Sequence, residues 1–381
     1  MSQASYFDEI IDRIDHNSDK WGKYSSDVIP MWIADMDFDA PKCVKEALSE
    51  RVNEGVYGYS YAPKSLVQAI QEHCLQRYQW SPSSAHFIHL PGLVCALHLC
   101  VRALSEPNDR ILVPSPVYYH LTKAPEMSDR KLDRIPFVLK GNRWSVDLDS
   151  LEESCKKADA SMLLLCNPHN PGATVYTREE LLAIHELAQR YDLRVVSDEI
   201  HCDLILSAAQ HIPFASLNDD AAQRTVTLMA PSKTFNIAGL GYAFAIIANS
   251  QLRQRFNHAR AGLIPAPNLF ALVAAEAAYR HGQIWHQELL QYLRANCAYL
   301  RQRISGTRIH MAEHEATYLA WLDIREYHLE NPHDFFLEAG VGISDGAGFG
   351  APGFIRLNFG CPRSQLEQAM NRILIALDSQ S

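Results

Sequence analysis

The sequence predicts an α/β protein with a large domain built on a mostly parallel, seven-stranded sheet and a smaller α+β domain at the C-terminal end. Short apolar, β-rich runs alternate with helix-like stretches between residues 86 and 247, which is typical of a parallel sheet with helices on both faces. After Ala266 long helices are followed by isolated strands. We therefore expect an arm and first helix over residues 1–45, packed on the small domain or a partner, a large domain over 46–266 and a small domain over 267–381.

The first eighty residues are predicted to form the arm and two helices. Trp21 and Trp32 lie in a polar segment with little periodicity, which indicates an arm packed against the rest of the protein. A helix over residues 41–52 would turn inward a face formed by Val44, Ala47, Leu48 and Val52. An aromatic loop at 55–63 separates it from a second helix, which Ser65 would cap.

The large domain is expected to contain seven strands, at residues 86–90, 111–113, 134–138, 161–166, 193–197, 225–229 and 242–247. An apolar helix is predicted over residues 92–104. Thr177 and Glu180 form a capping box, which predicts the start of another helix.

The C-terminal part is predicted to begin with mostly helical residues 268–304. Strands are then expected at 318–324 and 354–359, with a helix at 332–339 between them. A second capping box, from Ser364 to Glu367, would open the final helix.

The composition excludes several classes of protein. The sequence has 381 residues and a formal net charge of −9 with no basic block, which disfavours binding to nucleic acid or to an anionic membrane. No apolar run approaches the ~20 residues of a membrane span, and no secretory signal is visible. Nine cysteines without a C-x-x-C pair favour free thiols in a reducing compartment, so a cytoplasmic protein is expected.

Lys233 follows the strand predicted at 225–229 and lies in the segment Ser232-Lys233-Thr234. Taken alone, it could be an ordinary surface lysine. A lysine just past a strand end can also be held in a cleft, where loss of water makes its amine a better nucleophile. Because ligands of such sheets bind beyond the carboxyl ends of the strands, the residues after the other strands become informative.

Four other strand ends carry groups that could bind a ligand. Gly92 begins a helix whose free N–H groups can bind phosphate. Tyr118 could stack on a planar ligand, although it would serve equally well in the core or an interface. Asn170 can donate to a phenolate oxygen, and Asp198 can accept from a protonated ring nitrogen or cap a helix. Together with the amine of Lys233, these groups match what holds pyridoxal 5′-phosphate.

These motifs resemble, in order and spacing, those of the pyridoxal-phosphate enzymes of fold type I, the aspartate aminotransferase superfamily. The resemblance extends over nearly the whole sequence and rests on Asn170-Pro171-Gly172, Asp198-Glu199-Ile200, Ser232-Lys233 and Phe354 to Phe359. The sequence is most similar to the cystathionine β-lyase-like (MalY/PatB) branch of carbon–sulfur lyases. That similarity is carried by Ser18 to Trp21, Met31 to Phe38, Gly58-Tyr59, Asp198 to His201 and Ala230 to Asn236.

The resemblance implies how the cofactor ring would be held. Lys233 would bind the cofactor covalently and move protons, and Asp198 would pair with the ring nitrogen. Tyr118 would stack on the ring and Asn170 would reach its oxygen. His201 stands where many aminotransferases have a tyrosine that tunes the same oxygen, and the lyase branch shares the histidine.

The resemblance also implies contacts to the phosphate and the substrate. Arg356 would clamp the substrate α-carboxylate, with Ala34 beside it. Tyr59 of the partner subunit would reach the phosphate, which makes a homodimer the expected functional unit. The remaining phosphate contacts would come from Gly92, Leu93, Val94 and Ser232.

Three positions depart from the pattern of many relatives. Gly241 stands where they have a phosphate-binding arginine, Ala230 where they have a serine, and Tyr61 where some lyases have an arginine. The phosphate would therefore depend on backbone dipoles, on Ser232 and on the loop of the partner subunit.

The implied reaction is α,β-elimination on cystathionine or a related cysteine S-conjugate, giving pyruvate, ammonia and a thiol. The arm, the loops 57–61 and 345–350 and the partner subunit would recognise the group beyond the sulfur. An aminotransferase would use the same residues, and nothing in the sequence forbids that outcome. A third alternative is a regulatory protein that keeps the cofactor and acts by binding a protein partner.

Two other enzyme classes are not expected. No G-x-G-x-x-G motif follows a strand, which argues against a nicotinamide-dependent dehydrogenase. The 17 histidines show no ligand spacing in a suitable context, which argues against a metal enzyme.

Overall fold

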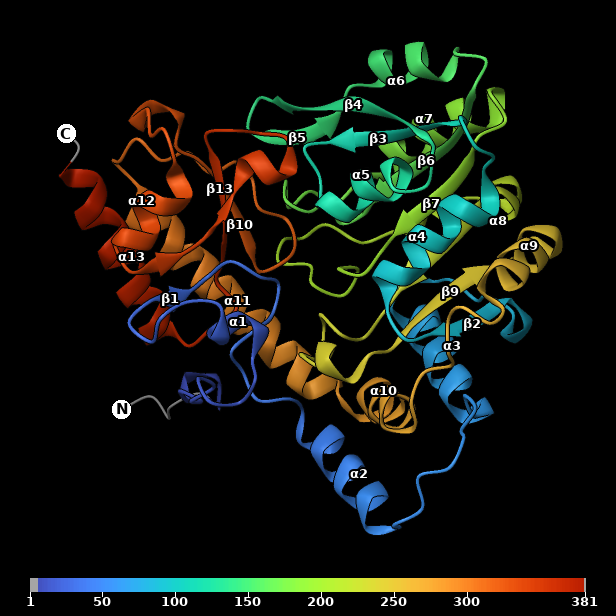
Figure 1. Ribbon diagram of the computed structural model, residues 1–381, viewed down its shortest axis with the longest axis horizontal. Helices are drawn as coiled ribbons and strands as arrows, with labels where there is room; N and C mark the ends of the chain where they lie inside the picture. The colour runs from blue at the N-terminus through green and yellow to red at the C-terminus, as the bar shows by residue number, and fades with distance from the viewer. Residues whose placement is uncertain (1–5, 380–381) are drawn as a thin grey trace.

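The structure, a computed structural model, describes residues 6–379 and confirms the predicted α/β class (Figure 1). The first five residues of the predicted arm lie outside the described residues. The largest sheet has the strand order β2-β9-β8-β7-β6-β3-β4-β5. Its strands are β2 (Phe87–Leu90), β3 (Arg110–Ser115), β4 (Lys131–Lys140), β5 (Arg143–Val146), β6 (Ala160–Cys166), β7 (Arg194–Asp198), β8 (Thr225–Met229) and β9 (Ala243–Ile247).

Most strands of this sheet run in one direction. β4, β3, β6, β7 and β8 are parallel to one another, whereas β9 is antiparallel to β8. Because β2 is antiparallel to β9, it points the same way as β8. The C-terminal ends of β2, β3, β6, β7 and β8 therefore lie along one edge of the sheet, where ligands of such folds bind.

The sheet has eight strands instead of the seven predicted. The additional strand is β5, which pairs antiparallel with β4 across a tight turn that contains Gly141. Its four residues, Arg143 to Val146, alternate polar and apolar, and a search for continuous apolar runs missed this short signal. The left-handed backbone of Gly141, with φ of 62°, is the feature that makes this turn possible.

Helices cover both faces of the sheet because strand side chains alternate between them. Ile111 and Val113 of β3 pack on one face with α4 (Leu93–Leu104), α5 (Tyr119–Glu126) and α9 (Ser250–Arg260). Leu112 packs on the other face with α6 (Leu148–Cys155), α7 (Arg178–Arg190) and α8 (Asp219–Arg224).

The C-terminal part contains a second, antiparallel sheet of β10 (Leu319–Asp323), β13 (Phe354–Asn358) and β12 (Ser344–Asp345). The arm joins this part of the fold through β1 (Ile29–Pro30), which pairs in parallel with β11 (Val341–Gly342). The helices of the C-terminal part are α11 (Gln283–Ile304), α12 (Pro332–Glu338) and α13 (Arg363–Asp378). α10 (Leu269–His281) packs instead on α2 (Lys42–Asn53) and α3 (Lys64–Tyr78). The division into domains at residues 45 and 266 stays a prediction.

One predicted capping box is confirmed and two predicted caps are wrong. Thr177 Oγ1 accepts from the N–H of Glu180, and Glu180 Oε2 accepts from the N–H of Thr177. Ser65 and Ser364 do not cap their helices, because Pro63 and Pro362 occupy the N-cap positions and place each serine in the first turn. On α2, Val44 is buried as predicted but Val52 is 48% exposed.

The cysteines are free thiols, as their spacing predicted. All nine lack a disulfide partner and seven are buried. Among residues 6–379, no helix is both long and apolar enough to cross a membrane.

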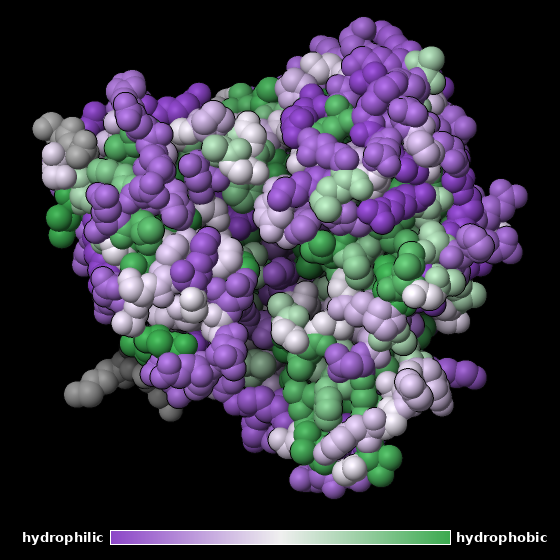
Figure 2. Space-filling model, viewed as in Figure 1, coloured by the Kyte–Doolittle hydropathy of each residue, from purple (hydrophilic) through white to green (hydrophobic). Residues whose placement is uncertain are grey.

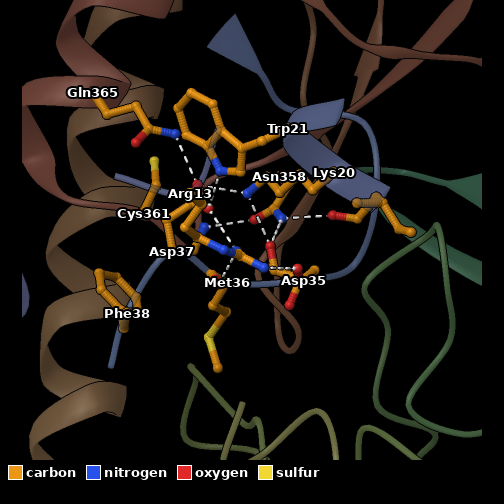
Figure 3. A network of polar contacts seen from close by, with 12 residues as sticks. Arg13, Lys20, Trp21, Asp35, Met36, Asp37, Phe38, Asn358, Cys361 and Gln365 are labelled. Atoms are coloured by element: carbon orange, nitrogen blue, oxygen red, sulfur yellow. Dashed lines mark hydrogen bonds and ion pairs between the residues drawn. The ribbon is translucent and has the colours of Figure 1, made fainter. Parts of the chain in front are cut away.

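A buried ion-pair network anchors the arm (Figure 3). Lys20, only 1% exposed, donates from Nζ to Asp37 Oδ2 at 2.6 Å. The other carboxylate contacts of Asp37 are with Arg13 at 3.0 Å, Trp21 Nε1 at 2.8 Å and Gln365 Nε2 at 2.8 Å. Because Gln365 belongs to α13, the network fastens the arm to the C-terminal part of the fold.

Replacing Asp37 with Asn should strongly destabilise the arm. The substitution leaves the buried Lys20 ammonium without its counter-ion, and we expect the free energy of unfolding to fall by about 3 kcal/mol. Urea unfolding followed by tryptophan fluorescence measures the change. Asp39→Asn, which removes an exposed ion pair with Lys45, should cost less than about 1 kcal/mol. Equal effects of the two substitutions would contradict a special role for the Lys20–Asp37 pair.

Candidate active site

A cavity of about 480 Å³ lies at the edge where the parallel strands end. Figure 2 shows the molecule hollowed between the part that carries α12 and α13 and the part that carries α4. The predicted site residues that line it are Ala34, Gly92, Leu93, Val94, Tyr118, Asn170, Asp198, His201, Ser232, Lys233 and Arg356. Tyr59 is the one predicted residue that the structure does not bring to this cavity.

Lys233 lies just past the end of β8, and its Nζ donates to the backbone carbonyl of Ala34 at 2.6 Å. Burial lowers the pKa of this amine to about 8, and the positive charge of Arg356 also lowers it. The carboxylates of Asp35 and Asp198 act in the opposite direction. A large share of the amine is therefore neutral slightly above neutral pH, as a nucleophile or proton acceptor requires.

The Ala34 carbonyl belongs to a row of five, which we call the arm carbonyls: the backbone carbonyl groups of residues 32–36. Two of them hold cavity residues directly. Trp32 O accepts from Arg356 Nη2 at 2.9 Å. Ala34 O accepts from Lys233 and also from the hydroxyl of the buried Tyr318 at 3.1 Å.

Two asparagines hold the other arm carbonyls. Asn358 Nδ2 donates to the carbonyls of Ile33 and Asp35, at 2.6 and 2.7 Å. Asn236 Nδ2 donates to that of Met36 at 3.1 Å, while its Oδ1 accepts from the N–H of Met36 at 3.2 Å. Asn358 follows Arg356 on β13 by two residues, and Asn236 follows Lys233 by three. Arg356 and Lys233 are therefore each close in sequence to an asparagine that clamps the arm, that is, one that donates to the arm carbonyls.

Arg356 is a buried cation that no carboxylate of residues 6–379 neutralises. Nη1 donates to Asn170 Oδ1 at 3.0 Å, and the guanidinium lies 4.7 Å from the ring centre of Phe349. Nε is buried without a partner among the described residues. Burial lowers the pKa of Arg356 to about 10, so it stays charged at neutral pH. A buried, unpaired guanidinium requires an anion.

Asp198 and His201 line the cavity beside Lys233. Asp198 ends β7 and accepts from the N–H of Ile200 at 3.2 Å. Burial raises the pKa of its carboxyl to about 7, which favours a cationic donor as its partner. His201 Nδ1 is buried and has no partner in the described structure, and burial lowers the pKa of the ring to about 3, so the imidazole is neutral.

The backbone between β2 and α4 forms another wall of the cavity. Gly92 is the N-cap of α4, and no side chain occupies this helix end. Gly241 lines the same wall with a left-handed φ of 70°, and a Cβ there would lie 3.0 Å from Pro91 O. This left-handed backbone favours glycine. Ala230 is buried in the core and does not line the cavity.

Tyr118 stands at the N-terminal end of α5, and its N–H donates to Asn170 O at 2.9 Å. Its ring lines the cavity, with the ring centre of Tyr119 4.8 Å away. Burial raises the pKa of Tyr118, so its hydroxyl stays protonated at neutral pH.

The arm and the loop 345–350 were expected to contact the substrate, and Trp32, Asp345, Gly348 and Phe349 of these segments line the cavity. Ser344, which also lines it, was not predicted, and neither were Tyr318 and Asn358, which act on it through the arm. Asn358 had a usable signal, because residues two apart on a strand share a face and Arg356 was already a candidate. Ser344 and Tyr318 had no comparable signal in the sequence.

The residues of the cavity fit pyridoxal 5′-phosphate. The unpaired atoms of Arg356 and His201 and the acceptor of Asp198 provide polar contacts for a charged, ring-containing ligand. The Lys233 amine can react with an aldehyde, and the free N–H groups at the start of α4 can bind phosphate.

The sequence matches the family model described as aminotransferase class I and II over residues 26–373. It is 37% identical to cystathionine β-lyase PatB of Bacillus subtilis, over 97% of this chain and 99% of that protein. The crystal structure of OvoB is 45% identical, with a TM-score of 0.95, over 98% of this chain and 99% of that one. The pyridoxal-phosphate-bound C–S lyase of Staphylococcus hominis is 31% identical, with a TM-score of 0.94, over 99% of each protein. The protein therefore belongs to the aminotransferase class I and II family.

Proposed function

We propose that this protein is a pyridoxal-phosphate-dependent carbon–sulfur β-lyase that converts cystathionine or a related cysteine S-conjugate to pyruvate, ammonia and a thiol. The observation that carries the proposal is the cavity in which the Lys233 amine, the Asp198 carboxylate and the Arg356 guanidinium are buried together. The relatives named as cystathionine β-lyase and C–S lyase support it.

The cofactor would be held by the groups already described. Lys233 would bind it covalently, Asp198 would pair with the protonated ring nitrogen, and Tyr118 would stack on the ring. Asn170 and His201 would bind the ring oxygen, while Gly92, Leu93, Val94 and Ser232 would bind the phosphate. When bound, pyridoxal phosphate supplies an electron sink for the negative charge that develops at the substrate Cα.

The side chains of the cavity perform the remaining steps. Arg356 binds the substrate α-carboxylate beside Ala34, which fixes the orientation of Cα. Once the substrate amine has displaced Lys233 from the cofactor, the freed, neutral amine of Lys233 would take the Cα proton. The Cβ–S bond would then break with its electron pair going to sulfur, while Cα and Cβ form a double bond. A thiolate is a good leaving group because thiols have a pKa of about 8.5. Water converts the remaining aminoacrylate to pyruvate and ammonia.

A homodimer would complete the site with Tyr59 of the partner subunit. Tyr59 is fully exposed and lies in the loop between α2 and α3, outside the cavity of its own subunit. Large apolar side chains are exposed on and next to this loop, namely Val52, Val56, Tyr57 and Tyr61. Figure 2 shows apolar atoms gathered on the face that carries α4 and α10. Burial of such a face between two copies stabilises a dimer.

The nine free cysteines fit a reducing compartment such as the cytoplasm. Transamination and a regulatory role with a protein partner remain the alternatives, and assays of pyruvate release and of amino-group exchange separate all three.

Purified protein should release pyruvate from L-cystathionine without an added keto acid. Lys233→Ala removes both the covalent anchor and the proton acceptor, so the rate should fall at least about a thousandfold. Coupled lactate dehydrogenase measures pyruvate. Exchange of amino groups between an amino acid and a 2-oxo acid, with no pyruvate from cystathionine, would identify an aminotransferase. Inactivity in both assays with bound cofactor would favour the regulatory alternative.

Capture of pyridoxal phosphate by Lys233 in the apoprotein should depend on pH with a midpoint near 8, since burial lowers the pKa of this amine to about 8. Only the neutral amine reacts, so the capture rate rises with pH and levels off above the midpoint, whereas an unperturbed lysine has a pKa of about 10.4. Adducts fixed with borohydride can be counted by mass spectrometry. Arg356→Gln removes a positive charge that lowers the pKa and should move the midpoint upward. A midpoint near 10 in the unaltered protein would contradict the burial of the amine.

Two inactive variants should restore activity together if the site is shared between subunits. Co-expression of Tyr59→Ala with Lys233→Ala forms mixed dimers in which one site has both native residues. Random pairing leaves about a quarter of all sites intact, so activity at limiting cofactor should return to about that level. Mixing Lys233→Ala with Asp198→Ala, both in the same cavity, is the control and should restore none if each cavity draws these two residues from one subunit. Absence of complementation in the first pair would contradict the contribution of Tyr59 across the interface.

A further inference from the structure

The outer wall of the cavity carries a lysine, a histidine and an aspartate that the proposed chemistry does not use. They are Lys23 from the arm, His333 at the start of α12 and Asp345 at the end of β12. Because the cofactor and the substrate α-carboxylate occupy the groups around Lys233 and Arg356, these three residues face whatever lies beyond the substrate sulfur.

Lys23 is held over two aromatic rings. Its Nζ lies 3.9 Å from the ring centre of Trp32 and 5.1 Å from that of Tyr24. The Trp32 ring is fixed in turn, since Nε1 donates to Lys20 O at 3.2 Å. Cation–π contacts keep the ammonium at the cavity wall without neutralising its charge.

Lys23 is the wall residue left without a polar partner. His333 contacts the Tyr24 hydroxyl through Nε2 at 3.2 Å and Asp334 through Nδ1 at 2.9 Å. Asp345 caps the turn that follows it, accepting from the N–H of Ala347 at 2.8 Å. No hydrogen bond or ion pair engages the Lys23 ammonium within residues 6–379, so its donors are available to a ligand.

Trp32 connects Lys23 to the substrate end of the cavity. Its carbonyl accepts from Arg356, and its ring lies under Lys23. An amino acid with its α-carboxylate on Arg356 can therefore extend its side chain along Trp32 toward a second cation at the exposed mouth.

We propose that Lys23 is a specificity-determining residue that binds an anionic group at the far end of the S-substituent. The preferred substrates are then cysteine S-conjugates whose leaving thiol carries a carboxylate. This inference rests on the proposed lyase function and adds the substrate class that the site selects.

The test compares two conjugates that differ only in the distal charge: S-(2-carboxyethyl)-L-cysteine and S-(2-carbamoylethyl)-L-cysteine. The holoenzyme should prefer the acid by about fivefold in kcat/KM, as an ion pair at a partly exposed site provides. Lys23→Met keeps the length of the side chain and removes the charge, so the ratio of kcat/KM for the acid to that for the amide should fall to about one.

Lys123→Met is the matched control. Lys123 stands over the ring of Tyr119, another wall residue, with Nζ 4.9 Å from the ring centre, but it does not itself line the cavity. This substitution removes the same net charge close to the site and should leave the preference for the acid intact.

Binding gives an independent measurement. L-2-aminopimelate has a methylene in place of the sulfur of the acidic conjugate and cannot release a thiolate. Calorimetry should show that it binds the unaltered protein about fivefold more tightly than its distal amide does, and that Lys23→Met removes the difference.

Three results would overturn the assignment of Lys23: equal use of acid and amide, a preference that survives in Lys23→Met, or faster turnover of S-(2-aminoethyl)-L-cysteine than of the acid. Absence of pyruvate from every conjugate would instead contradict the lyase function. In that case the binding comparison alone decides whether Lys23 recognises the distal anion.

Discussion

Five consecutive carbonyl groups of the arm, from Trp32 to Met36, are each bound by a side chain from elsewhere in the sequence, and the cavity depends on these contacts. Their donors come from the segment after β8 and from β13, which also provide Lys233 and Arg356. Lys20, which forms the buried ion pair with Asp37, also donates to the Asp35 carbonyl and so holds the same stretch of arm. The arm therefore acts as a template that sets the spacing between the amine and the guanidinium, two groups that approach the cavity from different parts of the fold.

Burial is the main cause of the electrostatic properties of the cavity. It lowers the pKa values of Lys233, Arg356 and His201 and raises that of Asp198, so each shift favours the neutral form. Lys233 and Asp198 are thereby brought close to neutral pH, whereas Arg356 stays charged. A neutral amine beside a permanent cation is suited to a substrate that presents both an acidic C–H and a carboxylate. Because Arg356 is buried without a counter-ion among the described residues, an anionic ligand that pairs with its guanidinium stabilises the folded protein.

The sequence was sufficient for the fold class and most strands, because their apolar runs are local signals. It also located the residues at the strand ends, since parallel topology brings them to one edge. The clamps of Asn236 and Asn358 could not be predicted, because each joins positions some 200 or 320 residues apart in the sequence. Local effects explain other errors: the prolines at 63 and 362 displaced the serine caps, and β5, with only four alternating residues, depends on the turn at Gly141. No local pattern indicated that Tyr59 lies outside the cavity of its own subunit. Only the resemblance, which assigns Tyr59 to the site of the partner subunit, led to that expectation.

The acceptor for the Lys233 amine is a backbone oxygen, that of Ala34. Every amino acid carries this oxygen, so a substitution at position 34 does not delete the contact. Evolution can therefore change the side chain at this position to reshape the cavity and keep the lysine aligned. The vulnerable positions are instead distant ones: a change at Tyr318 would remove a donor to this carbonyl, and a change at Asn358 would release the neighbouring carbonyls of Ile33 and Asp35, in neither case altering a group that touches a ligand. Sequence drift in this enzyme should consequently be freer at the cavity wall than among the polar residues that support it.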